Sequence, residues 1–292
     1  MIDPHVHLRD WDHAHKETVE HGIDVAYRAG LDGIFEMPNT SPPLTTKQRI
    51  LDRVKLADGA IEKLGLTGRF FHGIYGGITK DPEQIKAIVR AHAELFPRIV
   101  GLKMFAGHST GNMGIIDEEE QRMVYRTLAE AGYEGVLAVH CEKEKHMIAS
   151  AWDHKRPHTH TRARPPEAEI ESVKDQLRFA REEGFKGTLH ICHISTPQSV
   201  ALLEREDHLN VVCGITPHHA MLAAEDMDEI RGHLLKMNPP LRPREIQQAL
   251  QSASPVGCRP NGSFLAHHGA TARCRLPRSW QAEWSVADAP GS

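Results

Sequence analysis

The chain has 292 residues, of which 40% are hydrophobic and 25% charged, and its formal net charge at pH 7 is −4. This composition is typical of a globular protein, and the slight negative charge and 5% of aromatic residues argue against a nucleic-acid-binding surface. No apolar run reaches the ~18 residues of a membrane helix, and no signal-peptide pattern opens the chain, so no membrane association is expected. The five cysteines include no CxxC pair and are odd in number, which predicts a reducing compartment and a cytoplasmic location.

Short apolar runs alternate with longer amphipathic stretches along the chain. The apolar runs predict seven strands, at residues 2–7, 33–37, 69–75, 99–105, 135–140, 188–193 and 210–214. The stretches between them predict helices, at residues 15–29, 47–63, 82–95, 118–131, 166–183 and 197–206. Such alternation is typical of parallel βαβ units. The predicted fold is an α/β (β/α)8 TIM-type barrel, with a doubly wound open sheet as the alternative.

The composition changes near residue 250. Residues 251–292 contain no lysine and only two acidic residues, Glu283 and Asp288, and neither helical nor strand periodicity persists there. We therefore expect a barrel domain at residues 1–250 and an aberrant or disordered C-terminal segment at residues 251–292. The segment could be an extended tail or a stretch translated out of frame.

The first predicted strand carries two histidines and is followed by an arginine. Because alternate side chains of a strand share a face, His5, His7 and Arg9 would project together. Two imidazoles in this spacing predict metal ligands, and a guanidinium beside them suits a carboxylate. The alternatives are a chance spacing in a chain with 21 histidines, and a surface salt bridge from Arg9 to Asp10 or Asp12.

Three later strands end in, or contain, further candidate groups. His140 ends the run GVLAVHCE, His193 ends GTLHICHIST, and Lys103 lies inside the apolar run RIVGLKMFAG. We favour His193 over His190, which would face the other side of its strand. Because barrel active sites lie at the C-terminal ends of the strands, these groups are expected to converge with the first two histidines.

Four histidines suit a pair of divalent ions such as zinc. A desolvated, uncharged Lys103 could react with carbon dioxide to give a carbamate that bridges the two ions, whereas the alternative is a lysine that extends to solvent. Asn39 and Asn238 each precede a proline-rich turn near the predicted mouth, so they are either turn residues or groups that recognise an amide.

Seven motifs occur in an order that resembles dihydroorotases of the amidohydrolase superfamily: DPHVHLRD, EMPNTSPP, GLKMFAG, VHCE, HICHIST, TPHH and KMNPPLR. The resemblance implies a (β/α)8 barrel that interconverts carbamoyl-aspartate and dihydroorotate in pyrimidine synthesis. It implies His5 and His7 as ligands of a first zinc ion, His140 and His193 as ligands of a second, and Lys103 as a bridging carbamate. It also implies that Arg9, Asn39 and Asn238 bind the substrate's carboxylate and ring amide.

The sequence departs from the family pattern at two places, the N-terminus and the eighth strand. The sequence starts on the first predicted strand, so the β-sandwich of many family members is expected to be absent. The eighth strand, which ends in a T-D-H-A-P-H pattern in the family and carries the aspartate that moves the proton, is not found; Asp288 is followed by no histidine. We therefore expect an incomplete or aberrant eighth strand and low activity, low stability, or both.

Other readings of the same residues stay open. A hydantoinase-like or allantoinase-like amidohydrolase would share the metal ligands and usually lack the arginine. A catalytically inactive homologue would instead bind a partner protein. The partner expected from the resemblance is a second copy of the chain, as a homodimer, or aspartate transcarbamoylase.

Overall fold

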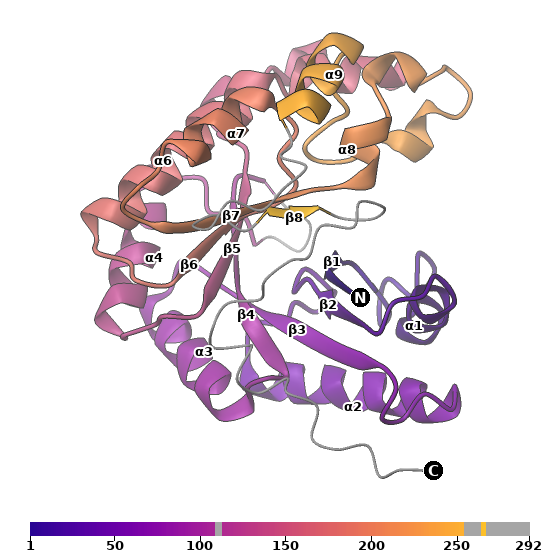
Figure 1. The fold of residues 1–292 in the computed structure, drawn as a ribbon, viewed down its shortest axis with the longest axis vertical. Coiled ribbons are helices and arrows are strands. Elements are labelled where there is room, and N and C mark those ends of the chain that lie inside the picture. The colour runs from indigo at the N-terminus through magenta and orange to yellow at the C-terminus, as the bar shows by residue number, and fades with distance from the viewer. Residues whose placement is uncertain (109–112, 254–263, 267–292) are drawn as a thin grey trace.

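The computed structural model describes residues 1–108 and 113–253 and the backbone of residues 264–266. Its strands form one parallel sheet in the order β1-β2-β3-β4-β5-β6-β7-β8. The sheet curls, and helices α2, α3, α4, α6 and α7 lie on its outer side (Figure 1). A doubly wound sheet would reverse its strand order, so the sequential order confirms the TIM-type arrangement and excludes the alternative.

The seven predicted strands are all present, with ends within two residues of the prediction. They are β1 (Ile2–Val6), β2 (Gly33–Glu36), β3 (Phe71–Gly77), β4 (Ile99–Ala106), β5 (Val136–Cys141), β6 (Thr188–Ile191) and β7 (Asn210–Ile215). Two of the differences matter for the site. Strand β1 ends before His7, and strand β6 ends two residues before His193.

The eighth strand is short. Strand β8 (Phe264–Ala266) has three residues and pairs with β7 from Cys213 to Ile215. Within the described residues, β8 does not pair with β1, and the strands form no second sheet. The remaining residues of the segment predicted to be aberrant, apart from the end of α9, lie outside the described residues.

The helices follow the prediction closely. They are α1 (Val19–Arg28), α2 (Lys47–Lys63), α3 (Pro82–Leu95), α4 (Glu118–Glu130), α5 (His160–Ala163), α6 (Pro166–Glu182), α7 (Pro197–Glu204), α8 (Pro217–Met221) and α9 (Arg244–Ala253), with 3-10 turns η1 (Glu144–His146), η2 (Ala149–Ala151), η3 (Pro157–Thr159), η4 (Ala224–Asp226) and η5 (Gly232–Leu235). Helix α1 begins four residues later than predicted, because the side chain of Thr18 accepts a hydrogen bond from the main chain of His21 and caps the helix there.

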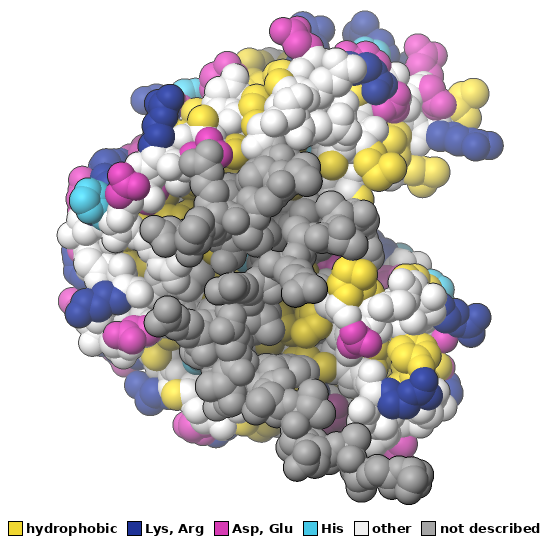
Figure 2. All heavy atoms as spheres, in the orientation of Figure 1, with side chains coloured by type: hydrophobic (Ala, Val, Ile, Leu, Met, Phe, Trp, Pro, Cys, Tyr) yellow, Lys and Arg dark blue, Asp and Glu magenta, His cyan; other side chains and the backbone are white. Residues whose placement is uncertain are grey.

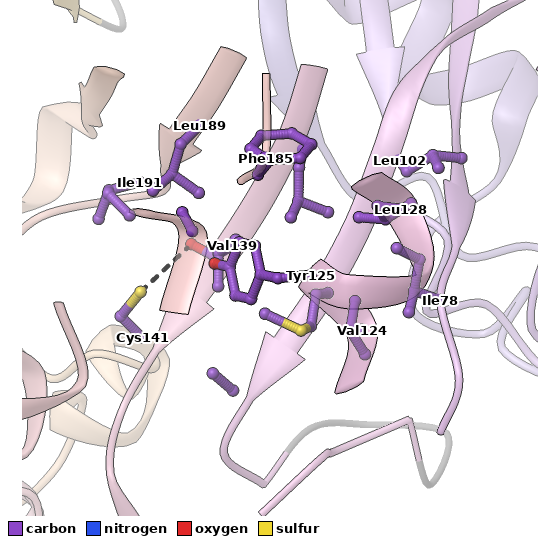
Figure 3. Close-up of a cluster of buried hydrophobic side chains, with 14 of the residues drawn as sticks. Ile78, Leu102, Val124, Tyr125, Leu128, Val139, Cys141, Phe185, Leu189 and Ile191 are labelled. Atoms are coloured by element: carbon purple, nitrogen blue, oxygen red, sulfur yellow. Dashed lines mark hydrogen bonds between the residues drawn. The ribbon is translucent and has the colours of Figure 1, made fainter. Parts of the chain in front are cut away.

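Apolar side chains fill both sides of the sheet. On the outer side, Leu102 and Val139 of the strands pack with Tyr125 and Leu128 of α4 (Figure 3). On the inner side, a smaller cluster includes Phe35, Tyr75, Ala138 and Cys192. Alternation along β4 and β5 therefore turns Lys103 and His140 away from the helices and toward the barrel interior.

The visible surface carries both signs of charge. Lysine and arginine side chains alternate with aspartate and glutamate around the outer rim, over the helices (Figure 2). Among the described helices, none is long and apolar enough to cross a membrane.

Candidate metal and substrate site

Imidazoles from three strands meet at one end of the barrel. The rings of His5 and His7 lie 5.3 Å apart between centroids, and the ring of His5 lies 5.2 Å from that of His193. The ring of His193 lies 4.9 Å from that of His140. The four histidines predicted as metal ligands are therefore brought together, although His5 and His193 are 188 positions apart in the sequence.

The contact between His140 and His193 has the geometry of two ligands on one ion. Their Nδ1 and Nε2 atoms, respectively, are 3.2 Å apart. Two nitrogens bound to one tetrahedral zinc ion at ~2.0–2.1 Å would be separated by about 3.3 Å. The other ring nitrogen of His140, Nε2, lies 3.0 Å from Oε2 of Glu142 but makes no hydrogen bond of good geometry, and Nδ1 is the nitrogen that faces His193.

His193 is held in an unusual backbone conformation. Its φ is 38°, in the left-handed region that residues with a side chain rarely adopt. The prediction that His193 continues the alternation of the strand is wrong, because β6 ends at Ile191. The left-handed turn, rather than strand alternation, directs the ring toward His140 and His5. Strained residues of this kind gather at functional sites.

Two histidines of the cluster, His7 and His193, are held in their neutral form. Burial, with Arg9 and Lys103 nearby, lowers the pKa of His7 to about 3. Burial, with His140 and Lys103 nearby, holds the pKa of His193 well below its ordinary value. Metal binding requires a neutral imidazole, so both rings can offer a lone pair at neutral pH.

Lys103 is fully buried next to this cluster. Its side chain is 0% exposed, so the alternative that it extends to solvent is wrong. The ammonium group donates to Sγ of Cys192 at 2.9 Å and lies 5.0 Å from the centre of the Phe105 ring. None of the ion pairs among the described residues includes Lys103. A buried ammonium group without a carboxylate partner among the described residues is costly.

Arg9 and Asn39 lie beside His7, as expected. Nδ1 of His7 is 2.8 Å from Oδ1 of Asn39, and Nη1 of Arg9 donates to the main-chain oxygen of Asn39 at 3.2 Å. The salt bridge considered from Arg9 to Asp10 or Asp12 is not formed. Arg9 does not share the face of a strand, since β1 ends at Val6 and Arg9, Asp10 and Trp11 all have positive φ values.

Asn238 lies in the segment that follows η5, and its side chain is exposed. Its Oδ1 atom is 2.9 Å from Nε2 of His160. The next residue, Pro239, accepts a hydrogen bond from His219 at 3.0 Å, and the other ring nitrogen of His219 is bonded to Thr216. Both nitrogens of His219 are thus occupied by protein groups, so this ring supports the segment.

A buried polar network, which no sequence pattern predicted, lies behind the histidines. Arg164 forms a two-armed ion pair with Glu142. Burial would raise the pKa of the Glu142 carboxyl, but His140 and Arg164 together lower it to about 2. Arg242 donates to Oγ of Ser195 at 2.8 Å, and Ser195 in turn binds the buried carboxylate of Glu169. Glu142 lies two positions after His140, directly after β5 ends at Cys141, and that spacing was the available signal.

The donor set fits divalent zinc, although the ligands are not arranged around one finished site. Among the described residues, no three His, Cys, Asp or Glu side chains already form a complete ligand set. The fit rests instead on the facing nitrogens of His140 and His193 and on Nδ1 of His193, which is buried without a described hydrogen-bond partner. Imidazole nitrogens with a bridging oxygen anion are ligands that zinc accepts.

Comparison with known proteins agrees with the motifs. No family model matches the sequence. The chain is 32% identical over 253 residues to a dihydroorotase of Thermococcus kodakarensis, covering 86% of the chain and 52% of that protein. It is 32% identical over 261 residues to a dihydroorotase of Brevibacillus brevis, covering 86% of the chain and 56% of that protein. The chain therefore spans about half the length of these curated relatives.

Solved structures place the fold in the same group of enzymes. An L-hydantoinase from Arthrobacter aurescens matches with a TM-score of 0.71 and 26% identity, over 85% of the chain and 53% of that protein. A dihydroorotase from Saccharomyces cerevisiae, in complex with 5-fluoroorotic acid, matches in fold with a TM-score of 0.66 and 18% identity, over 91% of the chain and 68% of that protein. The predicted resemblance is confirmed: the chain is a homologue of dihydroorotases.

Proposed function

We propose that the chain carries the metal centre and substrate groups of a cyclic amide hydrolase that interconverts carbamoyl-aspartate and dihydroorotate. The observation that carries the proposal is the pair of facing nitrogens on His140 and His193, with His5 beside them. A cluster of buried imidazoles at the mouth of a barrel is costly to maintain unless it binds an ion. The homology to dihydroorotases supports the choice of substrate.

His5, His7, His140 and His193 would hold one or two zinc ions, with Lys103 bridging them as a carbamate. Bound zinc would supply polarisation of the substrate carbonyl and activation of a water molecule. Burial of Lys103 without a carboxylate partner supports the modification, since an uncharged amine is the form that reacts with carbon dioxide.

Arg9, Asn39 and Asn238 would bind the small-molecule substrate. The fork of Arg9 suits the carboxylate, and its contact with the main chain of Asn39 orients it beside His7. The two asparagines would contact the ring amide and its oxygens.

We find no counterpart in this sequence for the aspartate that moves the proton in the family. No T-D-H-A-P-H pattern occurs in the sequence, and the residues after Ala266 lie outside the described part of the chain. The described Glu142 is a poor replacement, because Arg164 and His140 already occupy its carboxylate. We therefore infer slow turnover by the chain as written. We keep the barrel at residues 1–250 and the aberrant segment at residues 251–292 as proposals, although α9 crosses this boundary and β8 pairs with β7. We also infer a cytoplasmic location.

Metal analysis with a turnover assay tests the proposal. We expect the full chain, prepared with zinc and bicarbonate, to retain one or two zinc ions by elemental analysis, and His193→Ala to lose most of them. The exposed His21 provides the matched control, since His21→Ala should leave zinc content unchanged. Wild-type protein that retains no zinc would contradict the proposal.

The second candidate is a hydantoinase-like or allantoinase-like enzyme, which the likeness to L-hydantoinase favours. The position of Arg9 distinguishes the candidates, because a carboxylate-free substrate does not need it. We expect Arg9→Met to weaken binding of dihydroorotate at least 10-fold and to leave binding of hydantoin unchanged. Equal binding of dihydroorotate by both proteins would favour the hydantoinase reading.

A third candidate is an inactive subunit that binds a partner, which the missing aspartate favours. Bound zinc without turnover is the expected result in that case. Light scattering on the purified chain, alone and with aspartate transcarbamoylase, would then separate a homodimer from a mixed complex.

A further inference from the structure

His160 contacts the segment that carries Asn238. Its Nε2 atom lies 3.0 Å from the main-chain oxygen of Met237 and 2.9 Å from Oδ1 of Asn238. His160 is buried, at 5% exposed, at the start of α5, whereas Asn238 is exposed. The buried ring of His160 therefore contacts Oδ1 of Asn238, whose residue is otherwise exposed to solvent.

The chemistry of this contact fixes the orientation of the amide. A main-chain carbonyl can only accept a hydrogen bond, so Nε2 of His160 must carry a hydrogen to face Met237. An Nε2–H group in turn needs an acceptor as its second neighbour, and the amide of Asn238 therefore presents Oδ1 to His160. Oxygen and nitrogen of an amide are otherwise easily interchanged, but here the carbonyl of Met237 settles the choice.

The packing of His160 makes this arrangement rigid. The ring of Trp152 meets that of His160 edge-on, with centroids 5.3 Å apart, and the ammonium group of Lys236 lies 4.6 Å from the centre of the Trp152 ring. The segment that begins at Asn238 is tied to the metal-ligand region through Arg242, which binds Ser195, two positions after His193.

We propose that His160 is a positioning residue that locks the Asn238 amide with its two N–H donors turned toward the ligand. Asn238 then recognises an oxygen acceptor, such as a carboxylate or a ring carbonyl, and discriminates against an N–H group at the same place. The inference rests on the proposed function, because that function places Asn238 against the substrate.

Ligand binding by the zinc-loaded full chain tests the proposal. We expect His160→Leu, which removes the donor, to weaken binding of dihydroorotate and of carbamoyl-aspartate about 5- to 10-fold in calorimetry. His160→Gln keeps an N–H donor at a similar reach and should recover most of the affinity. The matched control is the exposed His158, and His158→Leu should bind both ligands as the wild type does.

A double-mutant cycle separates positioning from general damage to the fold. If His160 acts through Asn238, the His160→Leu change should cost little further affinity in an Asn238→Ala background. Zinc content should stay unchanged in all these variants. Additive losses in the double variant, or unchanged binding by His160→Leu, would overturn the proposal.

A spectroscopic measurement separates this inference from the proposed function. Nitrogen NMR of histidine-labelled protein should show His160 as the Nε2–H tautomer, with a signal assigned through its loss in His160→Gln. Wild-type protein that binds neither ligand would refute the proposed substrate, while the tautomer would still support the locked amide. An Nδ1–H tautomer would overturn the inference whatever the ligand result.

Discussion

Two buried cations of this barrel, Arg53 and Lys103, are both 0% exposed, but their surroundings differ. Arg53 of α2 reaches the buried carboxylate of Glu36 with Nε and Nη2, and Glu36 also contacts His72 at 3.0 Å. Lys103 instead has a thiol and an aromatic ring beside its ammonium group. The first arrangement compensates a buried charge, as a structural core requires. The second leaves the ammonium group without a carboxylate among the described residues, which supports the proposed modification of Lys103.

Removing one partner of the compensated pair should have the largest effect. Arg53→Met leaves Glu36 buried with its main cation gone, and we expect a loss of about 3–5 kcal/mol in the free energy of unfolding. Urea denaturation measures it. The matched control is Arg28→Met, which breaks an exposed ion pair with Asp24 and should change stability by less than about 0.5 kcal/mol. Similar losses of stability in both variants would show that the buried pair of Arg53 and Glu36 stabilises the fold no more than an exposed pair does.

The second largest effect should be the change in stability with pH that Glu36 causes. Burial would raise the pKa of Glu36, but His72 and Arg53 hold it below its ordinary value of 4.5. Since the pKa is lower in the folded chain, Glu36 contributes stability that is fully present above pH 4.5 and is lost as the pH falls through the folded pKa. We expect Glu36→Gln to be less stable at neutral pH and to lose less stability on acidification. Denaturation curves between pH 7 and pH 3 that run parallel for the two proteins would contradict this.

Replacing Lys103 should increase the free energy of unfolding, whereas replacing Arg53 should decrease it. In metal-free protein without bicarbonate, Lys103→Met removes a desolvated charge and keeps an apolar side chain of similar length. We therefore expect a gain of about 1–3 kcal/mol in the free energy of unfolding. The same variant should retain less zinc than the wild type. A clear loss of stability in Lys103→Met would show that the lysine is compensated after all.

The smallest effect concerns the thiol beside Lys103. Cys192→Ala removes the acceptor of Lys103 and a buried sulfur, for an expected loss of about 1 kcal/mol. Cys192→Ser keeps an acceptor and should lie closer to the wild type. If both variants equal the wild type by thermal unfolding, the contact between Sγ and Nζ contributes nothing to stability.

The sequence predicted the framework of this molecule well because the signals for it are local. Helices α2 and α3 begin and end where predicted, since Thr46 and Asp81 cap them and Pro82 fits a first helical turn. The meeting of the histidines also followed from topology, because parallel strands carry their C-terminal ends to one mouth.

Features that depend on tertiary contacts were beyond the sequence. The left-handed turns at Arg9 and His193 leave no pattern in a single sequence, so strand alternation was applied past the ends of β1 and β6. The partners of buried charges, such as Arg53 for Glu36 and Arg164 for Glu142, come from elements 17 and 22 positions away. That residues 267–292 belong to an aberrant segment stays a prediction, because they lie outside the described residues.

A hydrogen bond from Nη2 of Arg53 to the main-chain oxygen of Arg9, at 2.9 Å, joins the core helix α2 to the turn that carries Arg9. The guanidinium of Arg53 also lies 4.7 Å from the centre of the Trp11 ring. Arg53 therefore contacts the residues on both sides of Asp10 in the left-handed turn. The carboxylate-binding role proposed for Arg9 is thereby coupled to a core helix. Under that proposal, substitutions inside α2 that move Arg53 would change which acids bind, without altering any residue that touches the ligand.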